Sequence, residues 1–453
     1  MSGARIEATE VARKMVHIGV GFCALLIPWL TWWQGALICA AGIAGNVLLL
    51  PALTRHRLER DDERVRRYAA GIVLYPAAVG MLFVLFGSRP DVVAAAWGIL
   101  AFGDGMATLA GKSLGGPRLP WNGGKTLSGL LAFVAAGTAA ATWLARWAAP
   151  PDAAGALPVW AFAAAAVVGA IVESLPTGLN DNLSVPIVAG AFLFALTHAQ
   201  PSLLLSGAAW AQALPWAAAA NALLALAALA SRSVSASGAV AGWIVGTVVF
   251  AFGGWQAFLI LLLFFVVGTA ATRVGYENKR ARRLAQEDGG RRGARHALAN
   301  CGVPAFLALV AAASPFPDVV KVGLVAALAT AAFDTVSSEI GQVYGRRPFL
   351  VTTLKPVPAG TEGAVSVEGT LAGAAASAVL ALVALPLGLM GSFGWAGSAV
   401  VVAAAFIGGM VESYLGASPL FAAGPSLNNE ALNFANTLVG ALAAVALCGA
   451  LAS

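Results

Sequence analysis

Long apolar runs fill most of the chain, and short polar stretches separate them. The runs are about 18 to 22 residues long, which is the length that a helix needs to cross a hydrocarbon core of about 30 Å while satisfying its own backbone hydrogen bonds. They do not alternate with the two-residue period of a transmembrane β-strand, so the pattern excludes a barrel. It predicts an all-α fold, a polytopic integral membrane bundle of roughly fifteen transmembrane helices.

The charged residues are few and unevenly placed. Hydrophobic residues make up 59% of the 453 residues and charged residues 11%. With the N-terminus in the cytoplasm, all of the 27 Lys and Arg residues except Arg89, Arg146 and Lys321 fall in segments predicted to be cytoplasmic. We therefore expect a protein of a bacterial cytoplasmic membrane with its N-terminus and active sites on the cytoplasmic side. The net charge of +6 follows from this topology and from attraction to the lipid bilayer, and it does not indicate a nucleic-acid partner.

The most informative polar stretch is residues 103–129, in which an acid precedes a loop rich in glycine and lysine. Asp104 lies in an apolar segment, where a carboxylate is costly unless it is paired, hydrated or bound to a cation. The backbone amides of the glycine-rich loop can approach phosphate closely, so Lys112 and Lys125 are candidates for binding nucleotide phosphates. A plain positive-inside loop is the alternative for the two lysines. The spacing of the loop does not match a Walker A motif.

Two further stretches on the same side carry candidate ligands. Arg13 and Lys14 share a helical face with His17, and they either hold phosphate oxygens or anchor the helix at the membrane surface. Asp181 and Asn182 follow an apolar run and offer hard oxygen ligands, which suit a Mg²⁺ ion bridged to phosphates. As a mere turn, this second stretch would be unremarkable.

The second half of the chain repeats this order of motifs. Residues 333–373 again place an acid before a basic, glycine-rich loop, and Val172-Glu173-Ser174 recurs as Val411-Glu412-Ser413. We match residues 126–129 with residues 370–373, and residues 180–182 with residues 428–430. The order of these matches predicts two related, parallel halves, residues 1–207 and residues 208–453.

The repeat predicts a second site in the second half. Its candidate acids are Asp334 and Glu339, and its candidate metal ligands are Asp334, Asn429 and Glu430. Its candidate phosphate-binding cations are Arg346, Arg347 and Lys355. The basic loop over residues 273–299 is typical of a lipid-surface patch. The alternative is that its flanks close over this second site.

These motifs carry a family resemblance. Residues 1 to about 200 resemble the membrane-bound polyprenol kinases, the group of dolichol and phytol kinases, in Gly103-Asp104-Gly105, Lys125-Thr126 and Asp181-Asn182. The C-terminal part resembles the transmembrane protein 19 family, which includes a phytyl-phosphate kinase, in the sequences SASGAVAGWIVGT, FDTVSSEIG and KPVPAGTEGAVSVEGT. The chain thus looks like a fusion of the two.

The resemblance implies a function. It implies transfer of a phosphoryl group from CTP, or another nucleoside triphosphate, to a membrane isoprenoid alcohol such as phytol or geranylgeraniol, and then to the resulting monophosphate. Mg²⁺ would be held by Asp104 and Asp181, one of which is alternatively the base. Two other classes remain open. A CDP-lipid synthase would attack the α-phosphate and release diphosphate, and a lipid transporter or scramblase would place its site at the membrane midplane.

Overall fold

The computed structural model describes residues 8–48, 70–119, 122–149, 157–174, 180–200, 202–203, 209–282, 292–417 and 429–452. The chain divides into two compact units, Met1–His198 and Ala199–Ser453. The predicted boundary at residue 207 lies outside the described residues.

The all-α membrane fold is confirmed. Eleven helices in the described part of the chain are long and apolar enough to cross a membrane, and Val73–Phe86 and Val159–Ser174 form shorter apolar helices. One of the eleven, α13 (Ala236–Arg273), consists of two helices joined at Gly254, whose φ of 83° interrupts the helical backbone. The count of fifteen spans and the parallel orientation of the two halves stay predictions.

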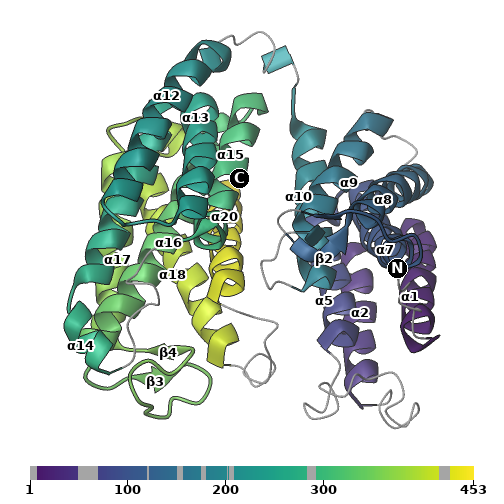
Figure 1. Ribbon diagram of the computed structural model, residues 1–453, viewed down its shortest axis with the longest axis horizontal. Helices are drawn as coiled ribbons and strands as arrows, with labels where there is room; N and C mark the ends of the chain where they lie inside the picture. The colour runs from purple at the N-terminus through teal and green to yellow at the C-terminus, as the bar shows by residue number, and fades with distance from the viewer. Residues whose placement is uncertain are drawn as a thin grey trace. The chain divides into compact units, whose positions relative to one another are not determined.

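The helices of the first unit run in sequence as shown in Figure 1. They are α1 (Ala8–Gly21), the 3₁₀ helix η1 (Phe22–Trp29), α2 (Trp32–Leu48), α5 (Ala70–Phe86), α6 (Pro90–Gly98), the π-helical turn η2 (Ile99–Asp104), α7 (Gly105–Ser113), α8 (Leu127–Ala148), α9 (Val159–Ser174) and α10 (Asp181–His198). A short antiparallel hairpin, β1 (Arg118–Leu119) and β2 (Asn122–Thr126), connects α7 to α8.

The second unit is built in the same way. Its elements are α12 (Ala209–Ala230), α13, α14 (Tyr276–Ala281), α15 (Ala294–Ala313), α16 (Pro317–Tyr344), β3 (Phe349–Leu350), β4 (Ala364–Val365), α17 (Val367–Ala384), the 3₁₀ turn η4 (Gly391–Phe393), α18 (Gly394–Ala417) and α20 (Asn429–Ala452). The hairpin of β3 and β4 connects α16 to α17, at the end of this unit where α14 also lies (Figure 1).

Each unit has one central helix. In the spans Pro90–Ser113 and Pro317–Tyr344, 78% of the residues in the most apolar 18-residue stretch are buried. In the other candidate spans this share is 44% or less. Both helices begin with the sequence Pro-Asp-Val-Val, and they carry Asp104 and Asp334. The two predicted acids therefore lie on the most enclosed helix of their units.

The connection after each central helix has the same geometry. The Thr126 hydroxyl accepts a hydrogen bond from the Gly129 backbone N–H and caps α8, and the Ser366 hydroxyl does the same for Gly369 and α17. These caps pair Thr126 with Ser366, so the predicted match of residues 126–129 with residues 370–373 is wrong by four residues. The position of Lys125 is then taken by Val365.

A second contact supports this alignment. A Cβ atom built on Gly103 would lie 3.0 Å from the Phe133 ring, and one built on Gly373 would lie 3.1 Å from the Phe333 ring. Each aromatic ring thus fills the space left by a glycine on the facing helix. The glycine is on the central helix in the first unit and on α17 in the second.

Candidate functional site

The first unit gathers charged side chains around Asp104. This residue ends η2, a π-helical turn, and such turns occur frequently at functional sites. Its carboxylate is buried and lies 2.7 Å from Lys14 Nζ of α1. Nε2 of His17, one turn further along α1, lies 3.3 Å from Asp104 Oδ2 and 3.2 Å from the Leu100 carbonyl oxygen.

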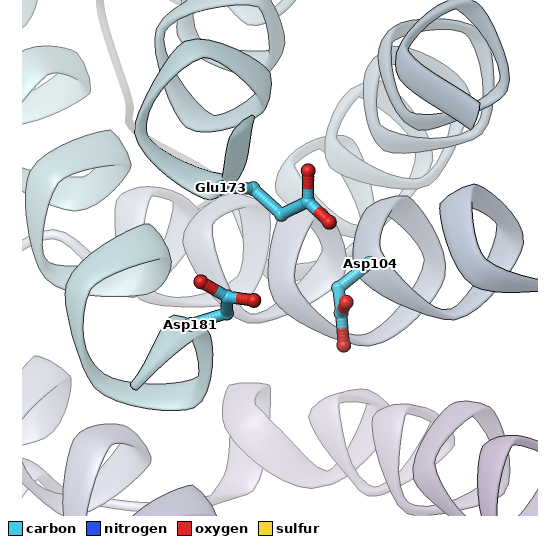
Figure 2. Close-up of side chains that lie close together, drawn as sticks. All are labelled: Asp104, Glu173 and Asp181. Carbon is cyan, nitrogen blue, oxygen red and sulfur yellow. The ribbon is translucent and has the colours of Figure 1, made fainter. Parts of the chain in front are cut away.

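Two other carboxylates face Asp104. Glu173 lies in the last turn of α9 and Asp181 begins α10. One oxygen of each of the three acids lies within 4.8 Å of those of the other two. Figure 2 shows that they converge on a common space from three different helices. The sequence analysis gave Glu173 no role in the site, although its recurrence as Glu412 was a usable signal.

Lys125 joins this group from the hairpin. It forms an ion pair with Glu173, and its Nζ lies 3.5 Å from Asp181 Oδ2. Asn122 of the same strand donates to the Ser174 carbonyl oxygen at 3.0 Å and so fastens the hairpin to the end of α9. Burial lowers the pKa of Lys125, but the carboxylates of Asp181 and Glu173 raise it more, so this pKa lies above its usual value. The ammonium group therefore stays charged at neutral pH.

We call these five residues the first cluster: Lys14, Asp104, Lys125, Glu173 and Asp181. Three carboxylates and two ammonium groups leave one negative charge in excess. Carboxylate oxygens are the ligands that Mg²⁺ prefers, and three of them within one small space fit such an ion. A bound divalent ion would turn the excess to one positive charge, which suits an anionic phosphate ligand.

The other predicted residues of the first site lie around the first cluster. Arg13 precedes Lys14 on α1 and is half-buried, and Lys112 is exposed in the last turn of α7. Asn182 follows Asp181 and is half-buried, and its backbone N–H donates to the Asn180 side chain at 3.1 Å. Their predicted roles stay predictions.

The second unit also buries a charged group. Asp334 of α16 is 8% exposed, and its carboxyl group is hydrogen-bonded to that of Glu412 on α18. Asn436 of α20 donates from Nδ2 to Glu412 Oε2 at 3.4 Å. Asn433 donates to Asp334 Oδ2 at 3.3 Å when its amide nitrogen faces that oxygen. Of the predicted ligands on α20, Asn429 is exposed and Glu430 is half-buried.

The cations of this second group come from the flanks of the basic loop. Lys279 is 1% exposed, forms an ion pair with Glu339 and donates to the Thr272 carbonyl oxygen at 2.9 Å. Arg292 donates to the Thr272 hydroxyl at 3.4 Å and lies close enough to Glu339 and Asp334 to interact with their charges. Burial lowers the pKa of Arg292, although guanidinium groups remain protonated in proteins.

We call the five residues of this group the second cluster: Lys279, Arg292, Asp334, Glu339 and Glu412. The predicted cations Arg346, Arg347 and Lys355 are instead exposed, near or between the strands of the second hairpin. Sequence reasoning missed Lys279 and Arg292, because charged flanks of a loop are also typical of a membrane-surface anchor. It missed Glu412 although the repeated Val-Glu-Ser was recognised.

The fold and the two clusters define a helical integral membrane protein with buried acidic and basic groups in each unit. The family described as "Integral membrane protein DUF92" matches residues 219–441. The uncharacterized membrane protein sll0875 of Synechocystis sp. is 42% identical over 246 residues, which are 52% of this chain and 94% of that protein. The chain belongs to the DUF92 family of integral membrane proteins.

Two further relatives have names that state an activity. A protein named phytol kinase, of Synechocystis sp., is 37% identical over 135 residues, 27% of this chain and 55% of that protein. A protein named farnesol kinase, chloroplastic, of Arabidopsis thaliana, is 27% identical over 209 residues, 41% of this chain and 66% of that protein. The chain therefore spans less than two thirds of each named kinase. No solved structure matches the chain.

Proposed function

We propose that the protein is an isoprenoid alcohol kinase, which transfers the γ-phosphoryl group of CTP or another nucleoside triphosphate to a membrane alcohol such as phytol or geranylgeraniol. The observation that carries this proposal is the first cluster, in which three carboxylates and two lysines converge on the central helix of the unit. The relatives named phytol kinase and farnesol kinase support the substrate class.

Phosphoryl transfer depends on positioned positive charge more than on covalent chemistry with the protein. Lys14 and Lys125 would bind phosphate oxygens. Asp104 and Glu173 would hold Mg²⁺, which when bound neutralises phosphate charge. The alcohol oxygen forms a bond to the γ-phosphorus while the bond from that phosphorus to the β–γ bridging oxygen breaks.

The hydroxyl proton of the alcohol needs an acceptor, and Asp181 is the most accessible carboxylate of the first cluster. Its side chain is 36% exposed, whereas those of Asp104 and Glu173 are each 5% exposed. We assign the proton to Asp181 because a lipid alcohol reaches an accessible carboxylate without displacing a helix. The apolar tail of the alcohol stays in the bilayer.

The second unit extends the proposal to a second step, the phosphorylation of the isoprenyl monophosphate to the diphosphate. The observation that favours it is the second cluster, which has the same number of acids and cations as the first. The acceptor is itself an anion in this step, and Arg292 offers the planar, bidentate donor that phosphate favours. Both clusters would face the cytoplasm of a bacterial cell.

The experiment uses the purified full chain with γ-labelled CTP and either phytol or phytyl monophosphate. We expect Asp104→Asn to lower the rate of the first step by about 10²–10³-fold, because it removes a charged group that acts on the reacting phosphates. The rate of the second step should stay unchanged. Asp334→Asn should do the reverse and stop the reaction at the monophosphate.

Matched controls exist on the same two helices. Asp91 pairs with Arg89 at 2.7 Å at the start of α6, and Asp318 accepts a backbone hydrogen bond from Ser392 at 2.9 Å near the start of α16. Asp91→Asn and Asp318→Asn should retain both steps. Release of labelled diphosphate would indicate a CDP-lipid synthase. Absence of label from the lipid with every nucleotide tried would refute the kinase and leave a lipid transporter or scramblase as the explanation.

A further inference from the structure

Oxygen atoms from three helices of the second unit meet around Asp334, and one of them has no hydrogen-bond partner in the described part of the chain. The carboxyl groups of Asp334 and Glu412 are directly hydrogen-bonded to each other. Asn436 is fully buried and turns its Nδ2 to Glu412, while its Oδ1 has no hydrogen-bond partner in the described part of the chain. A buried amide oxygen without a partner is unusual in a folded protein and calls for a ligand or a water molecule.

Two facing carboxyl groups need a positive charge between them, either a shared proton or a metal ion. Within the second cluster, Lys279 already forms an ion pair with Glu339. Arg292 lies near both Glu339 and Asp334, and its guanidinium donates a hydrogen bond to Thr272. Glu412 instead contacts Asp334 and the amide of Asn436. The Asp334 and Glu412 pair thus lacks the close lysine that each acid pair of the first unit has.

We propose that Asp334, Glu412 and Asn436 form a binding site for one divalent cation of the Mg²⁺ class. Two carboxylates and an amide oxygen are hard oxygen donors, and they supply part of an octahedral shell. The remaining positions are left for water or for phosphate oxygens of a bound molecule. This ligand set differs from the one predicted from the sequence, since Glu412 and Asn436 replace Asn429 and Glu430 beside Asp334.

The relation between the two units gives independent support. Asp334 directly follows Phe333 on the central helix of its unit, and Asp104 directly follows Gly103 on the other central helix. Phe333 and Gly103 are the residues of the central helices that make the exchanged ring and glycine contacts described above. Glu412 lies in the repeated Val-Glu-Ser, as Glu173 does. The first-unit pair, Asp104 and Glu173, belongs to the group of acids whose oxygens lie within 4.8 Å. The same pair of acids therefore meets in both units.

Binding is tested with Mn²⁺ as the probe, because its free form is counted directly by electron paramagnetic resonance. The purified full chain, stripped with a chelator, is titrated with Mn²⁺. We expect the wild type to bind one Mn²⁺ per unit. Glu412→Gln and Asn436→Leu should each lose the second-unit ion and keep the first, while Asp104→Asn should lose only the first-unit ion.

Two variants separate loss of a ligand from loss of folding. Asn436→Asp supplies a carboxylate at the same place and should retain or tighten the second-unit ion. Asp318→Asn changes a carboxylate at the far end of α16 and should bind as the wild type does. Unchanged Mn²⁺ binding in Glu412→Gln and Asn436→Leu would overturn the proposal and leave a shared proton as the explanation of the carboxyl pair.

The cation site rests on the proposed function only for the use of the bound ion in phosphoryl transfer. The cation site and the kinase activity can therefore be refuted separately. Phosphorylation of phytyl monophosphate is measured on the same samples. If Glu412→Gln loses that activity but keeps the wild-type Mn²⁺ count, the cation site is refuted and the second step stands. If the ion is lost as expected but no protein sample phosphorylates any lipid, the cation site stands and the proposed function is refuted.

Discussion

The first and second clusters contain the same numbers of acids and cations but differ in the exposed fraction of these side chains. Each combines three acids with two cations. In the first, the side chains of Lys125 and Asp181 are 34% and 36% exposed, whereas those of Lys279 and Glu339 in the second are 2% and 7% exposed. An ion pair that keeps contact with water is worth little to stability, and a buried one is costly to break. The first cluster thus keeps contact with the surroundings through Lys125 and Asp181, whereas Lys279 and Glu339 lie in the core of the second unit.

The largest expected effect comes from breaking the buried pair. Lys279→Met removes the ion-pair partner of Glu339, whose side chain is 7% exposed, so we expect a loss of about 3–5 kcal/mol in the free energy of unfolding. Lys125→Met takes a part-exposed ammonium group away from Glu173, which is 5% exposed, and from Asp181, which is 36% exposed. It should cost less than Lys279→Met because water reaches Lys125 and Asp181. Thermal unfolding of the full chain in detergent measures both. Equal losses in the two variants would remove the distinction between the clusters.

The next largest effect on stability is expected where the helix after each hairpin approaches the helix before it. A Cβ on Gly369 would lie 2.5 Å from the Ser337 carbonyl oxygen, and one on Gly129 would lie 2.9 Å from that of Ala107. We expect Gly369→Ala and Gly129→Ala to destabilise the protein by about 1–3 kcal/mol each, with Gly369→Ala the worse.

The control for this pair is Gly242, which lies inside α13 with no atom within 4 Å of the place that a Cβ would occupy. Because alanine favours the helix over glycine, Gly242→Ala should stabilise the protein by about 0.5–1 kcal/mol. Denaturation midpoints of the three variants check the order. If Gly369→Ala were as stable as Gly242→Ala, the close approach of α17 to the Ser337 carbonyl oxygen would be refuted.

A smaller and equal effect is expected at the two helix caps. Thr126→Ala and Ser366→Ala each remove the hydroxyl that accepts the third backbone N–H of the helix, and each should cost about 1 kcal/mol. Thr126→Ser and Ser366→Thr keep the hydroxyl and should behave like the wild type. Chemical denaturation gives the values, and a loss at one cap only would contradict the equivalence of the two connections.

The smallest effect is the pH dependence of the Lys125 ion pairs. The folded-state pKa of Lys125 is raised, so its pairs contribute stability below the unfolded-state pKa of about 10.4 and lose it as the pH rises through the higher folded-state value. The difference in unfolding temperature between the wild type and Lys125→Met should stay constant from about pH 7 to pH 9 and shrink above about pH 10.4. A difference that disappears near neutral pH would show that Lys125 is not held by these carboxylates.

The sequence predicted most of the first cluster and little of the second. Lys14, Asp104, Lys125 and Asp181 were found because each is a charged group beside an apolar run, where burial without a partner is costly. The contacts between them depend on how four helices pack, which no local pattern encodes. The sequence also has charged groups beside an apolar run at Arg346, Arg347 and Lys355. These three side chains are nevertheless exposed in the second unit.

The error in aligning the two connections has a physical cause. Residues 126–129 and 370–373 share three of their four residue types, but the helix starts are set by a hydroxyl that caps the backbone, and serine serves as well as threonine. Likewise the kink at Gly254 and the π-helical turn before Asp104 depend on backbone angles that the neighbouring helices fix.

The exchanged ring and glycine contacts bear on how a chain with two similar units folds correctly. Repeated domains risk pairing a helix of one copy with the partner helix of the other during synthesis. If the central helix of the second unit packed on α8, Phe333 would meet Phe133 in a space made for one ring. If the central helix of the first unit packed on α17, Gly103 and Gly373 would leave a void. One residue on each of the two facing helices thus gives every central helix a preference for the partner helix of its own unit.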